Sequence, residues 1–266
     1  MSRVPVSVVV PCFRPAATVE RAAASVSAQS AKPLELILVD DGSGDGTAAL
    51  LQRLAERLGR DWVKVIELPA NRGPSAARNA GWGAATGELV AFLDADDAWH
   101  PRKLELQYAF MREHPGVALS GHGYSMHEIR GELALPLRAT RIELRHLLLR
   151  NRFVVPSIMV RRGLPLRFPE DRRHMEDHLF VCMLAQKGYR LELLDAPLAV
   201  LYKPQFGAAG QSADLIAMER GELSNYRALH RQGAYGAPAL LALYGWSLAK
   251  FLRRLAVVAW RRLAPR

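Results

Sequence analysis

The alternation of short apolar runs with helical segments in the first hundred residues is the feature that most limits the fold of this chain. Four apolar runs have the length of buried strands: 6–10, 34–40, 62–68 and 89–93. Three segments of helical character lie between them: 16–29, 47–58 and 74–85. Strands that alternate with helices of this length indicate βαβ units, so we predict an α/β fold with a mostly parallel sheet flanked by helices.

The pattern loosens after residue 97. We predict further elements in this order: a helix at 101–113, a strand near 117–121, a helix at 176–186, a strand at 191–202, and mainly helix from about 211 with a break at 233–238. The sequence therefore predicts a helical extension at the C-terminal end.

Size and composition exclude several classes of protein. With 266 residues, half of them hydrophobic, the chain can bury a core without disulfides or metal staples. The two cysteines, Cys12 and Cys182, are too few for a disulfide framework and indicate a reducing compartment. The sequence contains no run of 18 apolar residues, so it predicts no membrane-spanning helix. The apolar run 4–10 suits a strand better than a signal peptide. We therefore expect a cytoplasmic protein.

The net charge of +10 leaves several partners open. A pI near 10 is compatible with nucleic acid, a membrane surface or an anionic substrate. Much of the charge could equally reflect an arginine-rich composition, so its position in the chain has to decide.

Acidic residues follow two of the predicted strands. One strand ends in Asp40-Asp41-Gly42-Ser43 and another in Asp94-Ala95-Asp96-Asp97. Ligands of open α/β sheets bind beyond the carboxyl ends of the strands, and carboxylates that converge there repel each other unless a cation or donors intervene. Mg²⁺ or Mn²⁺ suits such oxygen ligands. The alternatives are a turn that caps the next helix for the first cluster, and a helix N-cap for the second.

A third motif surrounds the start of the helix at 74–85. Gly73 and Pro74 open this helix, whose N-terminus can face an anion. Arg78 follows one turn later and could reach a phosphate as a forked donor. The alternative is an exposed arginine on a helix surface.

Together these motifs resemble the family 2 glycosyltransferases of the GT-A fold. Four of them follow in chain order: Pro11-Cys12-Phe13 in 8–13, the acidic pair in 39–47, Arg78 in 71–81 and the second acidic cluster in 92–97. The resemblance is close over 4–105 and continues weakly to about 205 through Glu176-Asp177. It implies a glycosyltransferase domain at 1–205, with a nucleotide-binding half at 1–105 and an acceptor half at 106–205, before the helical extension at 206–266.

The resemblance also implies the reaction and the donor site. The family transfers one sugar, with inversion, from a nucleotide-diphosphate sugar that is usually UDP-linked. Pro11 and Phe13 would border the base, with Phe13 as a stacking platform. Asp40 would accept from N3–H of uracil, and Arg78 would lie near the nucleotide.

The same resemblance implies a metal site and a base. Asp94 would approach the ribose and the metal, and Asp96 would bind the divalent cation, Mg²⁺ or Mn²⁺, that bridges the diphosphate. Asp177 would be the catalytic base, because an acceptor hydroxyl must lose its proton as it attacks. The role of Asp97 is left open. The alternative for the Glu176-Asp177 pair is an acidic first turn that the helix dipole favours.

The sequence departs from the family pattern at two places. The family usually has Pro-x-Tyr-Asn where this chain has Pro11-Cys12-Phe13-Arg14, so the aromatic face stays while the hydroxyl and amide are lost. Lys203 lies where members often carry Tyr-Arg-x-His-x-Gly, and it could still meet a phosphate. The absence of Gln-x-x-Arg-Trp favours transfer of a single sugar over processive synthesis.

The last 22 residues are basic and have no acids. Apolar residues recur at helical spacing: Leu248, Phe251, Leu252, Leu255, Val258 and Ala259. Such a helix could lie in a membrane interface through 245–266, or could pack on the domain with a basic face toward solvent. Members of the family often use lipid-linked acceptors, which favours a peripheral position on the cytoplasmic face of the inner membrane in the synthesis of surface polysaccharide or glycolipid.

The alternatives to a glycosyltransferase are a sugar nucleotidyltransferase and a non-catalytic binding module. A sugar nucleotidyltransferase usually has a Gly-rich loop after its first strand, and Pro11-Cys12-Phe13-Arg14 has no glycine. A non-catalytic basic module on membrane or nucleic acid is the other alternative. No nucleic-acid-binding motif occurs, and acids at strand ends repel phosphates, so we expect no nucleic-acid partner.

Overall fold

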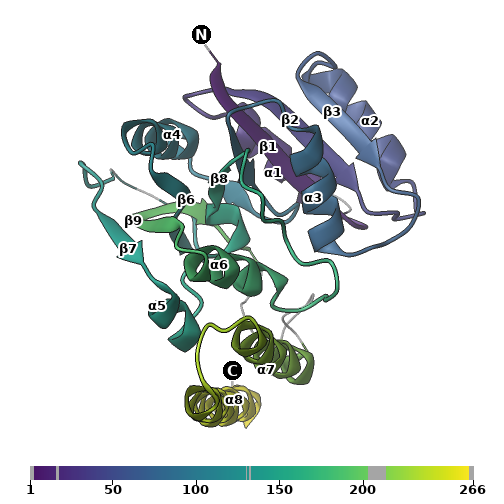
Figure 1. Cartoon of the computed structure of the whole chain (residues 1–266). Coiled ribbons are helices and arrows are strands. Elements are labelled where there is room, and N and C mark those ends of the chain that lie inside the picture. The colour runs from purple at the N-terminus through teal and green to yellow at the C-terminus, as the bar shows by residue number, and fades with distance from the viewer. Residues whose placement is uncertain (1–2, 16–17, 130, 132, 203–213, 264–266) are drawn as a thin grey trace.

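The computed structural model describes residues 3–15, 18–129, 131, 133–202 and 214–263, with side chains of the last helix up to residue 256. Lys203 and the side chains of Val258 and Ala259 lie outside the described residues. A single mixed sheet forms the centre of the molecule, and helices cover both of its faces (Figure 1).

The sheet is parallel in its N-terminal half, as predicted. Its first four strands are β1 (Val4–Cys12), β2 (Pro33–Asp40), β3 (Val63–Glu67) and β4 (Leu89–Phe92). Their order in the sheet is β3-β2-β1-β4, and every neighbouring pair is parallel. Because parallel strands of this kind end at one edge, the acidic clusters that follow β2 and β4 lie at the same edge of the sheet, one on each side of β1.

The second half of the sheet is mixed. Its strands are β5 (Ala98–Trp99), β6 (Val117–Ser125), β7 (Ala139–Ile142), β8 (Met159–Arg161) and β9 (Arg190–Val200). The short strand β8 pairs antiparallel with both β4 and β6 and so joins the two halves. Strand β9 is parallel to β6 and antiparallel to β5 and β7. Neither β7 nor β8 was expected from the sequence.

The helices follow from amphipathic patterns. They are α1 (Thr18–Ser27), α2 (Thr47–Leu58), α3 (Pro74–Ala84), α4 (Lys103–Glu113), α5 (Leu144–Leu149), α6 (Glu176–Gln186), α7 (Leu215–Arg231) and α8 (Ala237–Leu263), with a short 3₁₀ turn, η1 (Val155–Ser157). The predicted helices at 47–58 and 176–186 are confirmed at both ends.

Two apolar cores lie on opposite faces of the sheet. One core contains the inner faces of α1, α2 and α4, and the other contains those of α3 and α6. The alternation along β1 feeds both, since Val8 packs into the first core and Val9 into the second. Helix α3 approaches β1 so closely that a Cβ on Gly81 would lie 2.4 Å from Val9 Cγ1, which is why a glycine is required there.

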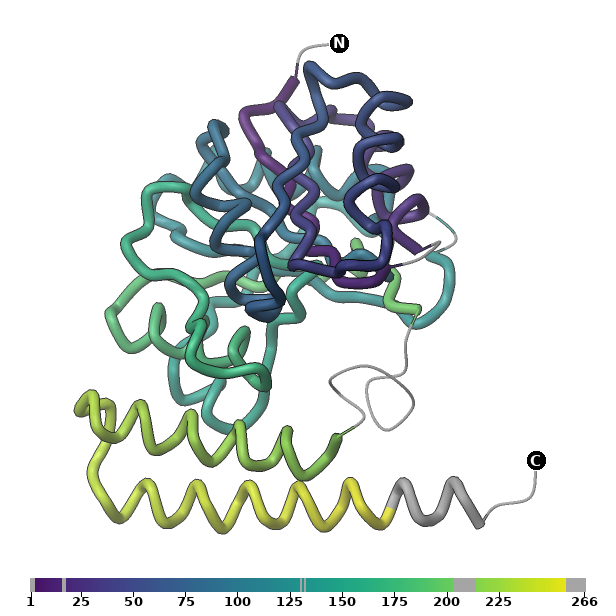
Figure 2. Tube along the Cα trace, turned by 90° about the vertical axis from the view of Figure 1, so that its right-hand side faces the viewer, coloured from purple at the N-terminus to yellow at the C-terminus, as the bar shows by residue number. Residues whose placement is uncertain are grey.

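The helices α7 and α8 form a hairpin at one end of the molecule, with α8 outermost (Figure 2). The predicted helical extension is confirmed, and its break falls between Arg231 and Ala237. Within the described ranges, no helix has both the length and the apolar character needed to cross a bilayer.

A buried carboxylate ties the opposite end of the sheet together. Glu35 of β2 accepts hydrogen bonds from Ser7 Oγ (2.6 Å), Thr86 N (2.7 Å) and Thr86 Oγ1 (2.6 Å), and it pairs with Lys64 of β3 at 2.5 Å. Burial alone would raise its pKa, but Lys64 and these donors outweigh burial and lower the pKa of Glu35 to about 2. One side chain thus connects three strands and the loop after α3.

The substitution Glu35→Gln should lower the free energy of unfolding by about 1–3 kcal/mol at neutral pH, because charged hydrogen bonds are lost. The folded pKa lies below the ordinary 4.5, so the wild-type contribution is full above that pH and is lost as pH falls toward about 2. Denaturant titrations across this range measure both effects. A variant whose stability falls with acid as steeply as the wild type would contradict the assignment.

Candidate active site

The carboxyl ends of the parallel strands open into one large cleft with a volume of about 1870 Å³. Its far wall comes from α6 and from the α7–α8 hairpin. The predicted site residues that line this cleft are Pro11, Phe13, Arg78, Asp94, Asp96 and Asp177. Asp40 is the predicted residue that does not line it. The structure therefore gathers six of the seven candidates, which come from four different parts of the chain, around one space.

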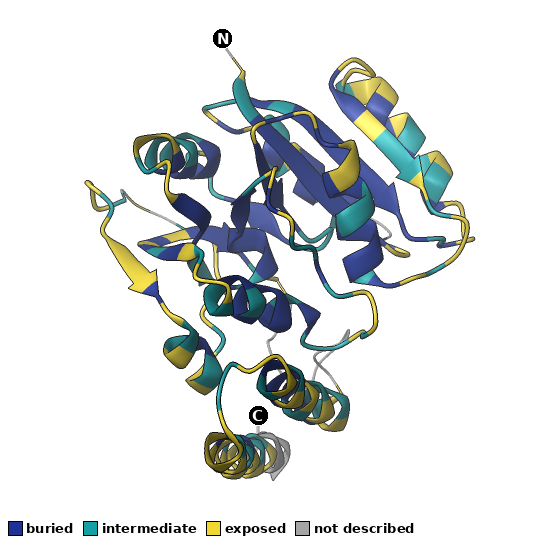
Figure 3. Cartoon of the chain, in the orientation of Figure 1, coloured by how far each residue is buried: buried dark blue, intermediate teal, exposed yellow. Residues whose placement is uncertain are grey.

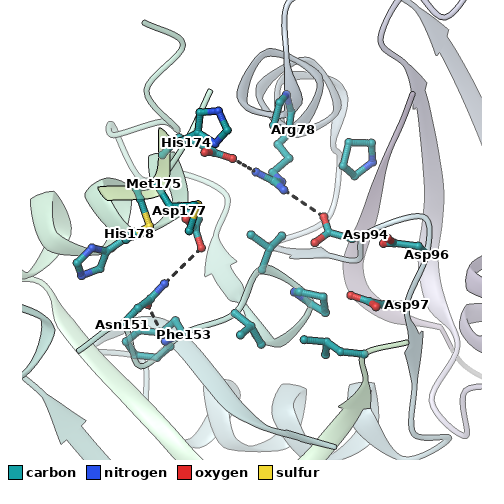
Figure 4. Close-up of a pocket in the computed structure, with 18 of the residues that line it drawn as sticks. Arg78, Asp94, Asp96, Asp97, Asn151, Phe153, His174, Met175, Asp177 and His178 are labelled. Carbon is teal, nitrogen blue, oxygen red and sulfur yellow. Dashed lines mark hydrogen bonds and ion pairs between the residues drawn. The ribbon is translucent and has the colours of Figure 1, made fainter. Parts of the chain in front are cut away.

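Arg78 forms the central contact of the cleft floor. Its Nη2 donates to Asp94 Oδ1 and its Nη1 to Glu176 Oε1, both at 3.1 Å, and Figure 4 shows the guanidinium between the β4 end and the α6 region. Only 5% of Arg78 is exposed, and its guanidinium carbon lies 5.4 Å from the centre of the Phe168 ring. The alternative of an exposed helix arginine is wrong. The forked side chain instead links the two halves of the chain.

The two carboxyl partners of Arg78 lie in a poorly solvated environment. Burial, and then the charge of Asp177, raises the pKa of Glu176 to about 7 although Arg78 acts in the opposite sense. Burial likewise raises the pKa of Asp94, with Arg78 opposing and Asp96 adding to the shift. The bridge therefore holds negative charge in a place where the protein would otherwise favour the protonated acids.

Asp177 occupies the first turn of α6 and is less buried than Glu176. The acidic first turn expected as the alternative is present, and it coexists with a place in the cleft. Met175 precedes the helix with a left-handed backbone, φ 60°, which is uncommon for a residue with a side chain. Asn151 Nδ2 contacts Asp177 Oδ2 at 3.4 Å, as Figure 4 shows. Among the described residues this long contact is the hydrogen bond that the Asp177 carboxylate makes, and Asp177 lines the cleft.

The loop that carries Met175 is held from behind by α7. Asn225 is fully buried; its Nδ2 donates to Met175 O at 2.8 Å, and its Oδ1 accepts from Arg172 Nη1 at 2.6 Å. A Cβ on Gly221 would lie 3.0 Å from His174 O, so α7 packs closely on the same loop. The sequence reasoning missed Glu176 as a partner of Arg78 and Asn225 as a support, since neither carries a local signal.

The Asp40-Asp41-Gly42-Ser43 cluster has a structural role at the end of β2. Asp40 is buried, and its Oδ1 accepts from the backbone N and the hydroxyl of Ser43, which closes the turn. Gly42 has φ 63°, and a Cβ there would lie 2.4 Å from the Ala70 backbone. The cluster does form a turn, but it does not cap α2, whose N-cap is Gly46.

Asp41 latches the start of α3. Its carboxylate accepts from the backbone N of Arg72 (2.9 Å) and of Gly73 (2.8 Å) and from Asn71 Nδ2 (3.0 Å). The sequence suggested that an external anion could face this helix N-terminus. In the structure these two backbone donors already face an internal carboxylate, which fixes α3 and with it Arg78.

The Asp94–Asp97 cluster is not a helix cap, since α4 begins at Lys103 after an N-cap at Arg102. Asp97 is buried and its Oδ1 accepts from Tyr202 N at 3.3 Å, so it holds the chain beyond β9. Asp96 lies on the cleft, and its carbonyl accepts from Arg21.

The donor set of the cluster suits a cation that is shared with a substrate. Among the described residues, no group of three or more His, Cys, Asp or Glu side chains could hold a metal by itself. Asp94 and Asp96 both line the cleft. Mg²⁺-type sites commonly use one or two carboxylates together with substrate phosphates and water. These residues therefore fit a divalent ion of that kind.

Arg78→Met should destabilise the protein by about 3–5 kcal/mol near pH 8, because the buried Glu176 and the partly exposed Asp94 lose their counter-charge. The loss should shrink near pH 5, where a raised carboxyl pKa lets the acids bind protons in the folded state. Denaturant unfolding at both pH values measures it. The matched control is Arg72→Met, since Arg72 pairs with Glu170 at the surface and should cost at most about 1 kcal/mol. Equal losses in both variants would contradict the bridge.

Comparison with known proteins identifies the family. The sequence model of glycosyl transferase family 2 matches residues 7–194. An uncharacterized glycosyltransferase of Haemophilus influenzae is 33% identical over 178 residues, 66% of this chain and 69% of its own. The putative teichuronic acid biosynthesis glycosyltransferase TuaG of Bacillus subtilis is 41% identical over 46% of this chain and 47% of its own. An Escherichia coli relative is 31% identical over 40% of each chain; it is the UDP-Glc:alpha-D-GlcNAc-diphosphoundecaprenol beta-1,3-glucosyltransferase WfgD.

A solved structure supports the fold. The mannosyltransferase PcManGT from Pyrobaculum calidifontis, in complex with GDP-Man and Mn²⁺, aligns over 100% of this chain and 77% of its own, with a TM-score of 0.68 and 22% identity. The GT-A architecture expected from the sequence is therefore confirmed. The segments of TuaG and WfgD that match this chain are 47% and 40% of the length of those two proteins. With a family match over most of its length, the chain belongs to glycosyl transferase family 2 and is a glycosyltransferase.

Proposed function

We propose that the protein transfers one sugar from a nucleotide-diphosphate sugar, UDP-linked, to an acceptor hydroxyl with inversion at the anomeric carbon. The observation that carries this proposal is the placement of Asp177 on the same cleft as Asp94 and Asp96, with the Arg78 bridge between them. A base on one side and a diphosphate site on the other is the arrangement that a single inverting displacement needs. The family match supports it over a nucleotidyltransferase or a non-catalytic module.

The nucleotide end of the proposed site lies at the end of β1. Phe13 lines the cleft with 47% of its surface exposed, which leaves a ring face for stacking on a base. Pro11 borders it. For Asp40 we keep the proposed acceptor role toward the base, through Oδ2, since Ser43 occupies Oδ1. Arg78 acts on the nucleotide side mainly by fixing Asp94.

Asp94 and Asp96 would hold the divalent cation, Mg²⁺ or Mn²⁺. When bound, such an ion neutralises the negative charge that develops on the departing diphosphate. The protein contributes the position of the Asp94 carboxylate, which the bridge from Arg78 fixes before a donor arrives, while the latch at Asp41 fixes the start of the helix that carries Arg78.

Asp177 is the proposed base. Glu176 is buried and bound to Arg78, whereas Asp177 lines the cleft and, within the described part of the chain, has only the long contact with Asn151. The Asp177 carboxylate takes the proton of the acceptor hydroxyl while the oxygen of that hydroxyl bonds to the anomeric carbon. In the same step the bond between the anomeric carbon and the diphosphate breaks. The transition state resembles an oxocarbenium ion, as in glycoside hydrolysis. No covalent enzyme intermediate forms, so the configuration inverts once.

The proposed acceptor is a sugar, free or lipid-linked, in the synthesis of a surface polysaccharide or glycolipid. The names of TuaG and WfgD, which refer to teichuronic acid and to a diphosphoundecaprenol acceptor, support this class. A lipid-linked acceptor implies a peripheral position at the membrane, and we include that position in the proposal.

The variant Asp177→Asn should keep donor affinity and lose transfer. Removing a general base costs about 10²–10⁴-fold in rate, and the amide has the same shape as the carboxylate. UDP release in the presence of Mn²⁺ and acceptor measures the rate, and calorimetry measures UDP affinity. Asp171→Asn is the matched control, because this exposed aspartate pairs with Arg172 outside the cleft lining. Full activity in Asp177→Asn would contradict the assignment of the base.

The variant Asp96→Ala should lose the cation dependence of donor binding. UDP should bind the wild type more tightly with Mn²⁺ than with EDTA, while the variant should bind equally weakly in both. Calorimetric titration with UDP under the two conditions measures this difference. No effect of Mn²⁺ on UDP binding by the wild type would overturn the proposed function.

A further inference from the structure

Helix α8 presents its apolar face to solvent. Four leucines along one stripe are strongly exposed: Leu241 (70%), Leu248 (55%), Leu252 (56%) and Leu255 (40%). Their spacing of seven, four and three residues places them on one side of a helix, and Figure 3 shows the outer helix largely in the colour of exposed residues. The sequence left open a helix with a basic solvent face and a buried apolar stripe. In the structure most of the described apolar stripe faces solvent, since Leu248, Leu252 and Leu255 are exposed. Of the basic residues, Lys250 and Arg254 are half-buried and Arg253 is exposed.

The polar side of α8 faces α7 and fixes this orientation. Ser247 Oγ donates to Glu219 Oε1 at 2.7 Å, and Lys250 pairs with Glu222. Arg254 Nη2 lies 3.0 Å from Glu222 Oε2. These groups are buried or nearly so, and a rotation that hid the leucines would separate buried charges from their partners. Separation of that kind is strongly unfavourable, so the outward apolar face is a built feature of the hairpin.

The apolar stripe borders basic residues at the mouth of the cleft. Trp246, 46% exposed, donates from Nε1 to Leu149 O at 3.1 Å, and Leu149 itself is 52% exposed. Three exposed arginines line the same cleft as Leu149 and Trp246: Arg150, Arg152 and Arg253. The segments 144–169 and 245–266 contain no acidic residue. The surface is therefore apolar with a cationic rim.

We propose that this surface, made of the outward face of α8 with Leu149, Trp246 and the three rim arginines, docks on a membrane that carries anionic headgroups. Charge favours this occupant over a second copy of the chain, since pairing two such surfaces would bring the arginines together. A helix of 27 residues is about 40 Å long and lies flat in the interface rather than across it. The rim arginines then set the cleft mouth against the headgroups, where a lipid-linked acceptor would enter.

This inference refines the membrane position in the proposed function, but its test needs neither donor nor acceptor. Flotation with phosphatidylglycerol–phosphatidylcholine vesicles is compared with flotation in pure phosphatidylcholine. The wild type should float with the anionic vesicles, and less so in about 1 M NaCl, which screens charges beyond about 3 Å. The double variant Leu248→Glu, Leu252→Glu should lower the bound fraction at least about tenfold.

The matched control is Ile216→Glu on α7, which places the same charge at a residue that is 57% exposed and outside the cleft lining. It should float like the wild type, and circular dichroism should show that all variants are folded. Equal binding by the double variant, or no binding by the wild type, would overturn the proposal. So would sedimentation that shows a dimer which the double variant dissociates. Failure of the proposed function is separate, since it is measured by UDP titration without vesicles.

Discussion

The contact on which the cleft depends is the buried bridge of Arg78 to Asp94 and Glu176. Asp94 follows β4, whereas Glu176 begins α6, 98 residues further along the chain than Arg78. A guanidinium holds its N–H donors in a rigid planar fork, so Arg78 can bind the two carboxylates through separate nitrogens in fixed directions. Because Glu176 immediately precedes Asp177, the same bridge sets the distance between the proposed base and the proposed diphosphate site.

Much of the N-terminal part of the fold, up to β4, could be predicted because its signals are local. The period of apolar residues marks strands and helices, and the helix at 47–58 ends where the pattern ends. The position of the acidic clusters on one edge follows from parallel strands alone. The partners of those acids could not be predicted in this way. Asp41 turns inward to the backbone of Arg72 and Gly73, although its sequence neighbourhood also suits an open ligand site.

The part of the fold that follows β4 was harder to predict because long-range contacts decide its structure. The short strand β8 is identified only by its two antiparallel neighbours. Met175, whose backbone is left-handed, accepts a hydrogen bond from Asn225, which lies 50 residues further along the chain on α7. For α8, the same periodicity fits a buried and an exposed apolar face. Glu219 and Glu222 on α7 select the exposed one, and no pattern within α8 itself contains that information.

The most direct measurement is a crystal structure of the Asp177→Asn variant grown with a UDP-sugar and Mn²⁺, with the metal located by anomalous scattering. We expect an anomalous peak beside Asp94 and Asp96, the uracil ring against Phe13, and the anomeric carbon facing residue 177. Manganese located away from both carboxylates, or a sugar turned away from the start of α6, would contradict it.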